Sequence, residues 1–230
     1  MHRGRRGDRG AGQRAHDVPR AAASGVTAKK KSLHASEQDT ERVQQARASY
    51  QAEVAALDPQ RFTFIEESGV NLAMTRLYGR APRGERVIGA VPQNYGAKVT
   101  MLASLGSHGI EAVMTIEGAT DTEVFRVYVE QVLRPTLHPG AIVIMDHLRA
   151  HKASGIREAI EQTGARLLYL PPYSPDLSPI ERCWAKLKTY LRKAKARPRD
   201  ALDAAITEAL ATITAADAHG WFAYSGYALR

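Results

Sequence analysis

Cysteine, long apolar runs and glycine-rich loops are all scarce in this sequence. One cysteine, Cys183, among 230 residues excludes an internal disulfide framework and is typical of a reducing compartment, so we expect a cytoplasmic protein. No apolar run approaches the roughly 18 residues that a membrane span needs, and no apolar segment follows the first arginines as a secretory signal would. The sequence shows no internal repeat and no glycine-rich phosphate loop. Its 44% hydrophobic and 24% charged residues indicate a globular protein.

Acidic residues are scarce at one end of the chain only. Residues 1–31 hold nine basic and two acidic residues, whereas the other 199 hold 23 basic and 22 acidic ones. Residues 1–30 also have almost no large apolar side chain, so we expect a disordered basic tail. That tail is either a solvated extension or translation-start artefact, or an arm that binds DNA.

Hydrophobic periodicity predicts alternating strands and helices in the rest of the chain. A helical lead-in at 31–58 precedes a domain at 59–230. Helices are expected at 36–57, 122–133, 152–163, 179–196, 199–213 and near Trp221. Strands are expected at 61–66, 86–92, 98–105, 109–116, 141–146 and 165–170. An antiparallel meander followed by two buried parallel strands predicts an α/β fold, a mixed sheet with helices on both faces.

Acidic residues recur where these elements meet. Glu66 and Glu67 end the first predicted strand, Asp146 ends the first parallel strand, and Glu181 opens a helix. Sites in open α/β sheets form at the carboxyl ends of strands. A cage of carboxylate oxygens suits hard cations such as Mg²⁺ or Mn²⁺. Two such ions can catalyse phosphodiester transfer.

Each acidic residue also has a structural explanation. Ser178-Pro179-Ile180-Glu181 has the S-x-x-E pattern, so Glu181 could close a capping box. Asp146 could cap the next helix, and Glu66 and Glu67 could be solvated charges at a strand end.

A basic cluster follows Glu181. Between Glu181 and Asp200 lie eight basic residues and no acidic residue, and Lys188 and Arg192 fall on a helical stripe beside Glu181. This cluster, which includes Lys193 and Lys195, is a better candidate for phosphate contact than the tail, although charge runs are often only solvated helix faces.

Other reactive side chains give weaker signals. His147 and His151 are four residues apart but have no cysteine partner and no second histidine pair, so a zinc site is not indicated. Cys183 stands beside Trp184 on a predicted helix and is expected to be a packed thiol.

Several of these segments together resemble a known family. They include Phe64-Ile65-Glu66-Glu67-Ser68-Gly69, Met145-Asp146-His147 with His151-Lys152, and Leu170-Pro171-Pro172-Tyr173-Ser174-Pro175-Asp176-Leu177-Ser178-Pro179-Ile180-Glu181. The chain resembles DDE-superfamily transposases of the mariner-related bacterial insertion-sequence group over about residues 30–226. The resemblance implies a ribonuclease-H-like fold in which two aspartates and a glutamate bind two Mg²⁺ or Mn²⁺ ions.

The resemblance also assigns the acidic residues. Asp146 corresponds to the second aspartate and Glu181 to the final glutamate, and their spacing of 35 positions matches that of the family. Glu66 stands where the family usually has aspartate, and the extra methylene displaces its oxygens by roughly an ångström, an error that can cost about 100-fold in rate. The helix-turn-helix region that usually precedes this domain shows no pattern in the first 30 residues.

Three functions follow as hypotheses. The first is a transposase catalytic domain that cuts and transfers DNA strands at element ends, with Glu66, Asp146 and Glu181 as metal ligands and Lys188, Arg192, Lys193 and Lys195 on DNA. The second is a catalytically impaired remnant that only binds DNA. The third is a cellular nuclease of the same fold. The expected partners are double-stranded DNA and a second copy of the chain, and the expected location is the bacterial nucleoid.

Overall fold

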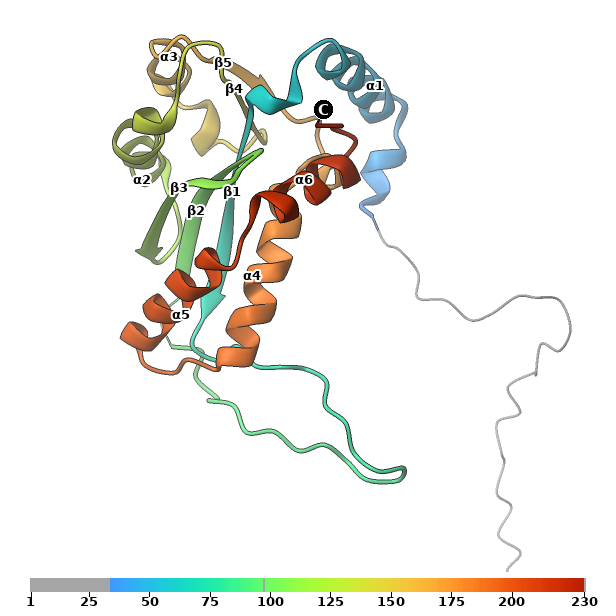
Figure 1. Ribbon diagram of the computed structural model, residues 1–230, viewed down its shortest axis with the longest axis vertical. Coiled ribbons are helices and arrows are strands. Elements are labelled where there is room, and N and C mark those ends of the chain that lie inside the picture. The colour runs from blue at the N-terminus through green and yellow to red at the C-terminus, as the bar shows by residue number, and fades with distance from the viewer. Residues whose placement is uncertain (1–33, 97, 230) are drawn as a thin grey trace, which may run out of the picture. The chain divides into compact units, whose positions relative to one another are not determined.

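A five-stranded mixed sheet forms the centre of the protein (Figure 1). The structure, a computed structural model, describes residues 34–96 and 98–229. The predicted tail at 1–30 therefore lies outside the described residues. In sheet order β3-β2-β1-β4-β5, the strands are β3 (Gly109–Glu117), β2 (Lys98–Gly106), β1 (Phe62–Asn71), β4 (Ile142–Met145) and β5 (Arg166–Tyr169).

The central strand β1 joins two kinds of pairing. It runs antiparallel to β2 and parallel to β4, and β4 runs parallel to β5. The predicted meander with two added parallel strands is confirmed. The first strand is longer than expected, because pairing with β2 continues as far as Asn71 opposite Lys98. Glu66 and Glu67 consequently lie in the middle of β1, and the prediction that they end the strand is wrong.

Helices cover both faces of the sheet, as predicted (Figure 1). One core cluster joins the sheet to α1 (Glu41–Ala55), α4 (Ile180–Ala194), α5 (Arg199–Ala211) and α6 (Ala215–Tyr224). The other joins it to α2 (Thr122–Val127), a π-helical turn (Tyr128–Leu133) and α3 (Ile156–Glu161). Short 3₁₀ turns lie at Ser36–Asp39, Pro59–Arg61, Arg134–Thr136, Ala150–Lys152 and Pro175–Leu177. None of the described helices has the length and apolar character that a membrane crossing requires.

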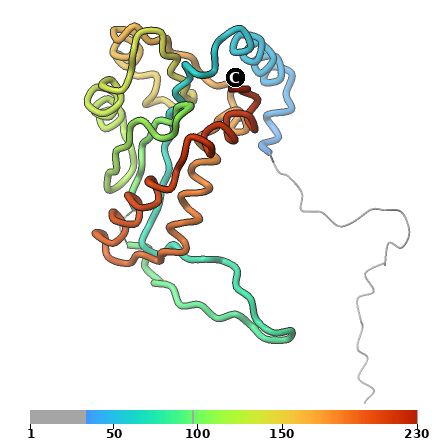
Figure 2. The backbone as a smooth tube through the Cα atoms, in the orientation of Figure 1, coloured from blue at the N-terminus to red at the C-terminus, as the bar shows by residue number. Residues whose placement is uncertain are grey.

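The strand predicted at 86–92 is wrong. These residues belong to a long loop, residues 72–96, that lies between β1 and β2 in the sequence and projects away from the sheet (Figure 2). Every residue from 76 to 96 is exposed. Val87, Ile88 and Val91 have strand propensity, but no neighbouring strand supplies the hydrogen-bond ladder or the packing surface that propensity depends on.

The helix predicted at 152–163 begins later, at Ile156. Gly155 stands before it with a φ of 88°, a left-handed conformation that glycine adopts without steric cost and that separates α3 from the preceding 3₁₀ turn. The shorter helix leaves the segment from Asp146 to Gly155 free to fold around the end of β4.

Helix α4 lies against the sheet through one apolar stripe. Ile180, Cys183, Trp184, Leu187 and Leu191 are buried along it. The spacing of Ile180, Trp184, Leu187 and Leu191 in the sequence predicts this stripe, which is confirmed. It fixes the rotation of the helix, because residues three and four apart share a face. Cys183 is a packed thiol, as predicted, and burial raises its pKa to about 12.

Candidate active site

Three elements bring together the acidic residues named from the sequence. Glu66 comes from β1, Asp146 directly follows β4, and Glu181 lies in the first turn of α4. Phe64 pairs with Ile144 across β1 and β4, so Glu66 and Asp146 occupy matching positions two residues further along neighbouring strands. Phe64 and Ile144 both pack in the core cluster that contains α4. Side-chain alternation therefore places Glu66 on the face of the sheet that α4 covers.

The carboxyl of Glu66 lies in a crowded electrostatic environment. Burial raises its pKa to about 7, the charges of Asp146 and Glu181 raise it as well, and the Glu67 N–H and His151 act in the opposite direction. Glu66 Oε1 accepts a hydrogen bond from the backbone N–H of Glu67 at 3.0 Å. The charges of Asp146 and Glu181 thus act on the Glu66 carboxyl. Acidic side chains that influence one another in this way are expected at a site that binds a cation.

Asp146 is held by two neighbours. Its Oδ1 accepts a hydrogen bond from the Leu148 N–H at 2.9 Å and lies 2.6 Å from His151 Nδ1. Burial alone would raise the pKa of Asp146, but these two contacts outweigh it and the pKa is lowered. Asp146 does not cap the next helix, so that structural explanation is wrong; its carboxylate instead closes a turn with the Leu148 N–H.

His151 is the residue that sequence reasoning missed. Its side chain is fully buried, its ring lies 4.1 Å from the ring of Phe125, and Nε2 lies 3.6 Å from Glu67 Oε1. Neither ring nitrogen has hydrogen-bond geometry with a described partner, so its contacts depend on charge and proximity. Burial lowers the pKa of His151, but the carboxylates of Asp146 and Glu67 outweigh it and raise the pKa to about 9.

His147 and His151 do not form a pair. His147 is exposed and its ring lies 4.9 Å from that of Tyr169, while His151 points into the core. The position of His151, five residues after Asp146, was the available signal for its role. His151 was considered with His147 as a zinc pair, and that pairing does not predict its contact with Asp146.

Glu181 does not take part in a capping box. Helix α4 begins after Pro179 without a side-chain cap, and the buried Ser178 hydroxyl has no hydrogen-bond partner among the described residues. The Glu181 carboxyl therefore remains available at the surface. Loss of water around that carboxyl raises its pKa, and Lys188 acts in the opposite direction.

The loop between β5 and α4 forms hydrogen bonds with α1 and with the turn that precedes α1. Arg47 of α1 donates hydrogen bonds to Ser174 Oγ at 2.7 Å and to Asp176 Oδ2 at 2.6 Å. Gln38 Nε2 donates to the carbonyl oxygen of Tyr173 at 2.8 Å. Tyr173 has a φ of 54°, an unusual value for a residue with a side chain, and these contacts hold the backbone there. The loop that leads into Glu181 is thus fixed from outside the sheet.

The four predicted DNA-contacting residues divide into two pairs. Lys188 and Arg192 line a hollow beside the end of β1. Lys193 and Lys195 are exposed at the end of α4 and do not line it, and Lys195 ends the helix in a left-handed conformation.

The acidic residues have the right ligand atoms for a hard divalent cation, but they do not surround a site for one. Carboxylate oxygens are the ligands that Mg²⁺ and Mn²⁺ prefer, and a cation would relieve the like-charge repulsion that raises the pKa of Glu66. Over residues 34–96 and 98–229, however, no three His, Cys, Asp or Glu side chains lie close enough to hold a metal ion together. The carboxylate ligands suit such a cation, but these described side chains do not lie close enough together to hold one in this structure.

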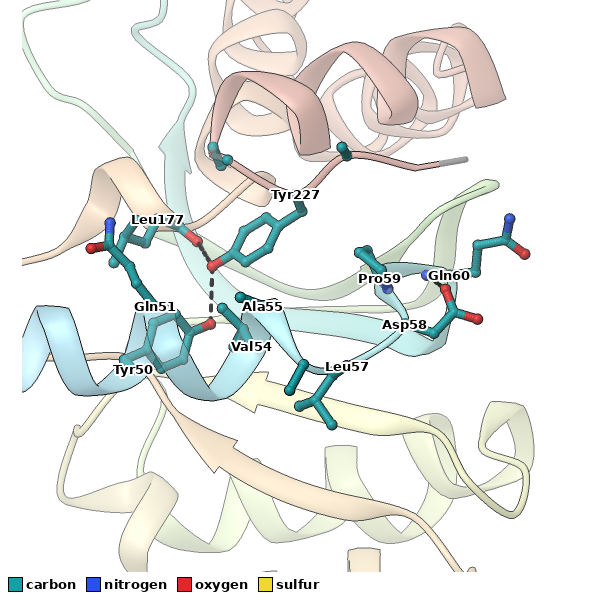
Figure 3. Close-up of a pocket in the computed structure, with 14 residues that line it drawn as sticks. Tyr50, Gln51, Val54, Ala55, Leu57, Asp58, Pro59, Gln60, Leu177 and Tyr227 are labelled. Atoms are coloured by element: carbon teal, nitrogen blue, oxygen red, sulfur yellow. Dashed lines mark hydrogen bonds between the residues drawn. The ribbon is translucent and has the colours of Figure 1, made fainter.

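A larger pocket lies elsewhere. It measures about 770 Å³ and is lined by α1, the segment that leads into β1, and residues 225–228 (Figure 3). Tyr50 and Tyr227 share a hydrogen bond of 2.9 Å at its wall, and the Tyr227 hydroxyl donates to the Leu177 carbonyl oxygen. None of the acidic residues above lines it, so its size does not make it the active site.

Comparison with known proteins identifies the family. The sequence model described as DDE superfamily endonuclease matches residues 61–203, more than half of the chain. The chain belongs to this family. The matched region of this DDE endonuclease contains Glu66, Asp146 and Glu181. No curated protein sequence matches the chain.

Solved structures of the Mos1 mariner transposase are similar to this DDE endonuclease. Its strand transfer complex has a TM-score of 0.66 at 16% identity, with 87% of this chain and 63% of that chain covered. Its catalytic domain has a TM-score of 0.56 at 13% identity, with 84% of this chain and 93% of that chain covered. The likeness shows a shared ribonuclease-H-like fold. This chain spans about two thirds of the Mos1 chain in its pre-cleavage transpososome, 65% of its length.

Proposed function

We propose that this chain is the catalytic domain of a transposase that cuts DNA strands at the ends of an insertion element and transfers them to target DNA. Membership of the DDE endonuclease family and the fold shared with the Mos1 catalytic domain support this assignment. Residues 59–230 form the catalytic domain and residues 31–58 its helical lead-in. The protein would act in the bacterial cytoplasm at the nucleoid.

The observation that carries the proposal is that Glu66 of β1 lies near enough to Asp146, after β4, and to Glu181, on α4, for both charges to raise its pKa. These three residues are the proposed catalytic metal ligands for two Mg²⁺ or Mn²⁺ ions. Structures of the Mos1 paired-end complex with Mg and with Mn support that choice. Such ions supply an activated attacking oxygen and stabilise the leaving oxygen.

The remaining residues bind and orient DNA in this proposal. Lys188, Arg192, Lys193 and Lys195 contact the phosphate backbone, since cations on one helix beside a carboxylate suit a strand whose scissile phosphate lies at that carboxylate. Arg47 holds the loop before Glu181 in place from α1.

The proposed partners are double-stranded DNA and a second copy of the chain. Of the eleven exposed large hydrophobic residues in the described part of the chain, six lie in the loop at 72–96, including Tyr78 at 89% and Ile88 at 92% exposed. A concentration of apolar side chains on one projecting loop favours a protein interface over a solvated turn. The Mos1 structures include a paired-end complex, which supports two copies on DNA.

A cleavage assay tests the catalytic assignment. The full chain is incubated with Mn²⁺ and a plasmid carrying the DNA that flanks its coding sequence. Nicking, together with strand transfer into a second duplex, is expected, and transfer separates a transposase from a cellular nuclease. Asp146→Asn and Glu181→Gln should each lose at least about 100-fold in rate, while Glu130→Gln, an exposed carboxylate on the far face, should not. Equal activity of all variants would refute the assignment.

One observation favours the second candidate, an impaired remnant that only binds DNA. Glu66 folds back onto the Glu67 N–H and titrates near neutral pH, so it is a weaker ligand than an ionised aspartate pointing into the site. Glu66→Asp separates the candidates. A rise from no cleavage to cleavage in that variant supports the remnant, whereas an active parent supports the enzyme.

A further inference from the structure

We propose that the hollow beside α4 is a subsite for one unpaired DNA nucleotide, three to five nucleotides from the cut phosphate. The proposal rests on the proposed function only in placing that phosphate at Glu66, Asp146 and Glu181. The hollow, called here the Tyr95 hollow, is an open depression of about 310 Å³. Its lining comes from the end of β1 and the loop that follows, including Gly69 and Ala73, and from Tyr95, Lys188 and Arg192.

Two unused cations form one side of the Tyr95 hollow. Lys188 and Arg192 are one turn apart on α4 and half-buried, and neither forms a hydrogen bond or an ion pair with a described residue. Lys193 and Lys195 do not line the hollow, and three other neighbouring cations are engaged. Lys186 pairs with Asp217 at 2.6 Å, Arg197 donates to backbone carbonyls of Leu72 and Met74, and Arg182 lies 3.5 Å over the ring of Tyr224. The two cations that face the hollow are therefore the ones left for a ligand.

An aromatic residue, Tyr95, also lines the hollow. The backbone of Tyr95 is fixed, because its carbonyl oxygen accepts the Leu72 N–H at 3.2 Å at the root of the projecting loop. The residue is nevertheless 64% exposed. A fixed backbone with an open ring is a stacking platform, and a groove that combines such a ring with cations is how proteins bind single-stranded DNA.

The floor of the hollow is open enough for a base. Gly69 and Ala73 contribute little bulk, and a Cβ placed on Gly69 would meet no atom within 4 Å. A phosphate alone needs only the two cations, whereas this recess also presents apolar and aromatic surface. A base within a duplex is stacked and paired, so the nucleotide that enters must be unpaired. Strand cleavage creates such ends.

Helix geometry sets the position of the nucleotide. Lys188 and Arg192 follow Glu181 by seven and eleven residues, which is about 10 and 16 Å along a helix that rises 1.5 Å per residue. A DNA strand advances about 3.4 Å per nucleotide. A strand with its 3′ end at the acidic residues therefore passes the hollow with its third to fifth nucleotide.

The test is a fluorescence scan without metal, using the full chain. A duplex with a six-nucleotide 3′ overhang carries 2-aminopurine at one overhang position at a time. Binding should change the emission at positions three to five from the 3′ end and leave the others nearly unchanged. Tyr95→Ala should abolish the pattern and weaken binding about 10-fold, while Tyr95→Phe should keep both. Tyr224→Ala, an exposed tyrosine away from the hollow, is the matched control.

The cations give a second, independent measurement. Lys188→Gln and Arg192→Gln should each lower the salt dependence of binding by about one phosphate contact and erase the position-specific signal. Lys193→Gln should lower affinity but keep the signal. A flat scan in the parent chain, or equal effects of Tyr95→Ala and Tyr224→Ala, would overturn the subsite.

The outcome separates this inference from the proposed function. A chain that shows the position-dependent signal but does not cut DNA with Mn²⁺ retains the subsite and loses the catalytic assignment. A chain that cuts DNA but gives a flat scan retains catalysis and loses the subsite.

Discussion

Glu66 and Glu67 are neighbours in sequence, yet they lie in opposite environments. Glu66 faces the α4 side of the sheet, where burial, with a further contribution from the charges of Asp146 and Glu181, raises its pKa to about 7. Glu67 faces the other side, where a buried His151 lies 3.6 Å from its carboxylate. Asp146 serves both sides, since it contacts His151 and shares the field of Glu66. On the α4 side, the acidic side chains keep negative charge that a ligand can balance. On the other side, His151 balances the negative charge within the fold.

The largest expected effect comes from removing the neutralising group. His151→Ala takes a fully buried ring from between two carboxylates and leaves both a cavity and unpaired charge. We expect a loss of about 3 kcal/mol in the free energy of unfolding, measured by urea denaturation. His147→Ala, on the same segment but exposed, should cost under about 1 kcal/mol. Similar losses for the two variants would show that His151 is not a structural partner of the carboxylates.

The two sides should also titrate in separate windows in metal-free buffer. His151 has a raised pKa of about 9, so its stabilisation is complete below about pH 6.5 and is lost as pH rises toward 9. Glu66 is also raised, to about 7, so its ionisation lowers stability between about pH 4.5 and 7. Each step should be worth roughly 3 kcal/mol, since one pKa unit corresponds to about 1.4 kcal/mol.

Variants assign the two steps. His151→Gln should remove the upper step and Glu66→Gln the lower one, as followed by thermal unfolding across pH. A single step that disappears in both variants would mean that the two sides are not separate.

A smaller loss of stability is expected from a substitution that disturbs only the α4 side of the sheet. Arg47→Met breaks the contacts to Ser174 and Asp176 that hold the loop before Glu181. We expect a loss of about 1 kcal/mol in stability and a lower cleavage rate, with the stability step assigned to His151 unchanged. Arg42→Met, on the same helix and exposed, is the control. If the His151 step shifts in Arg47→Met, the sides are coupled through the loop.

Local sequence patterns predicted much of this architecture. The alternating strands, the buried run before Asp146 and the apolar stripe of α4 follow from periodicity, and together they bring Asp146 and Glu181 to the same region. The assignment of 86–92 to a strand failed because strand propensity cannot reveal whether a partner strand exists. The end of β1 was misplaced for a similar reason, since its extension depends on Lys98, 27 positions after Asn71.

Contacts between distant segments account for the rest. His151 acquires its role only when Phe125 packs on its ring and Glu67 approaches from β1. The Tyr95 hollow needs the root of a 25-residue loop, residues 72–96, to return against α4. Neither arrangement has a local signature, because each depends on how three separate elements meet.

The central claim is that Glu66, Asp146 and Glu181 are ligands of one metal site, and a crystal structure of the full chain with Mn²⁺ tests it most directly. Anomalous density should lie among these three carboxylates, with oxygen to metal distances of about 2.2 Å and with Glu66 turned away from the Glu67 N–H. Density at any other position, or carboxylates that stay apart in saturating Mn²⁺, would contradict the claim.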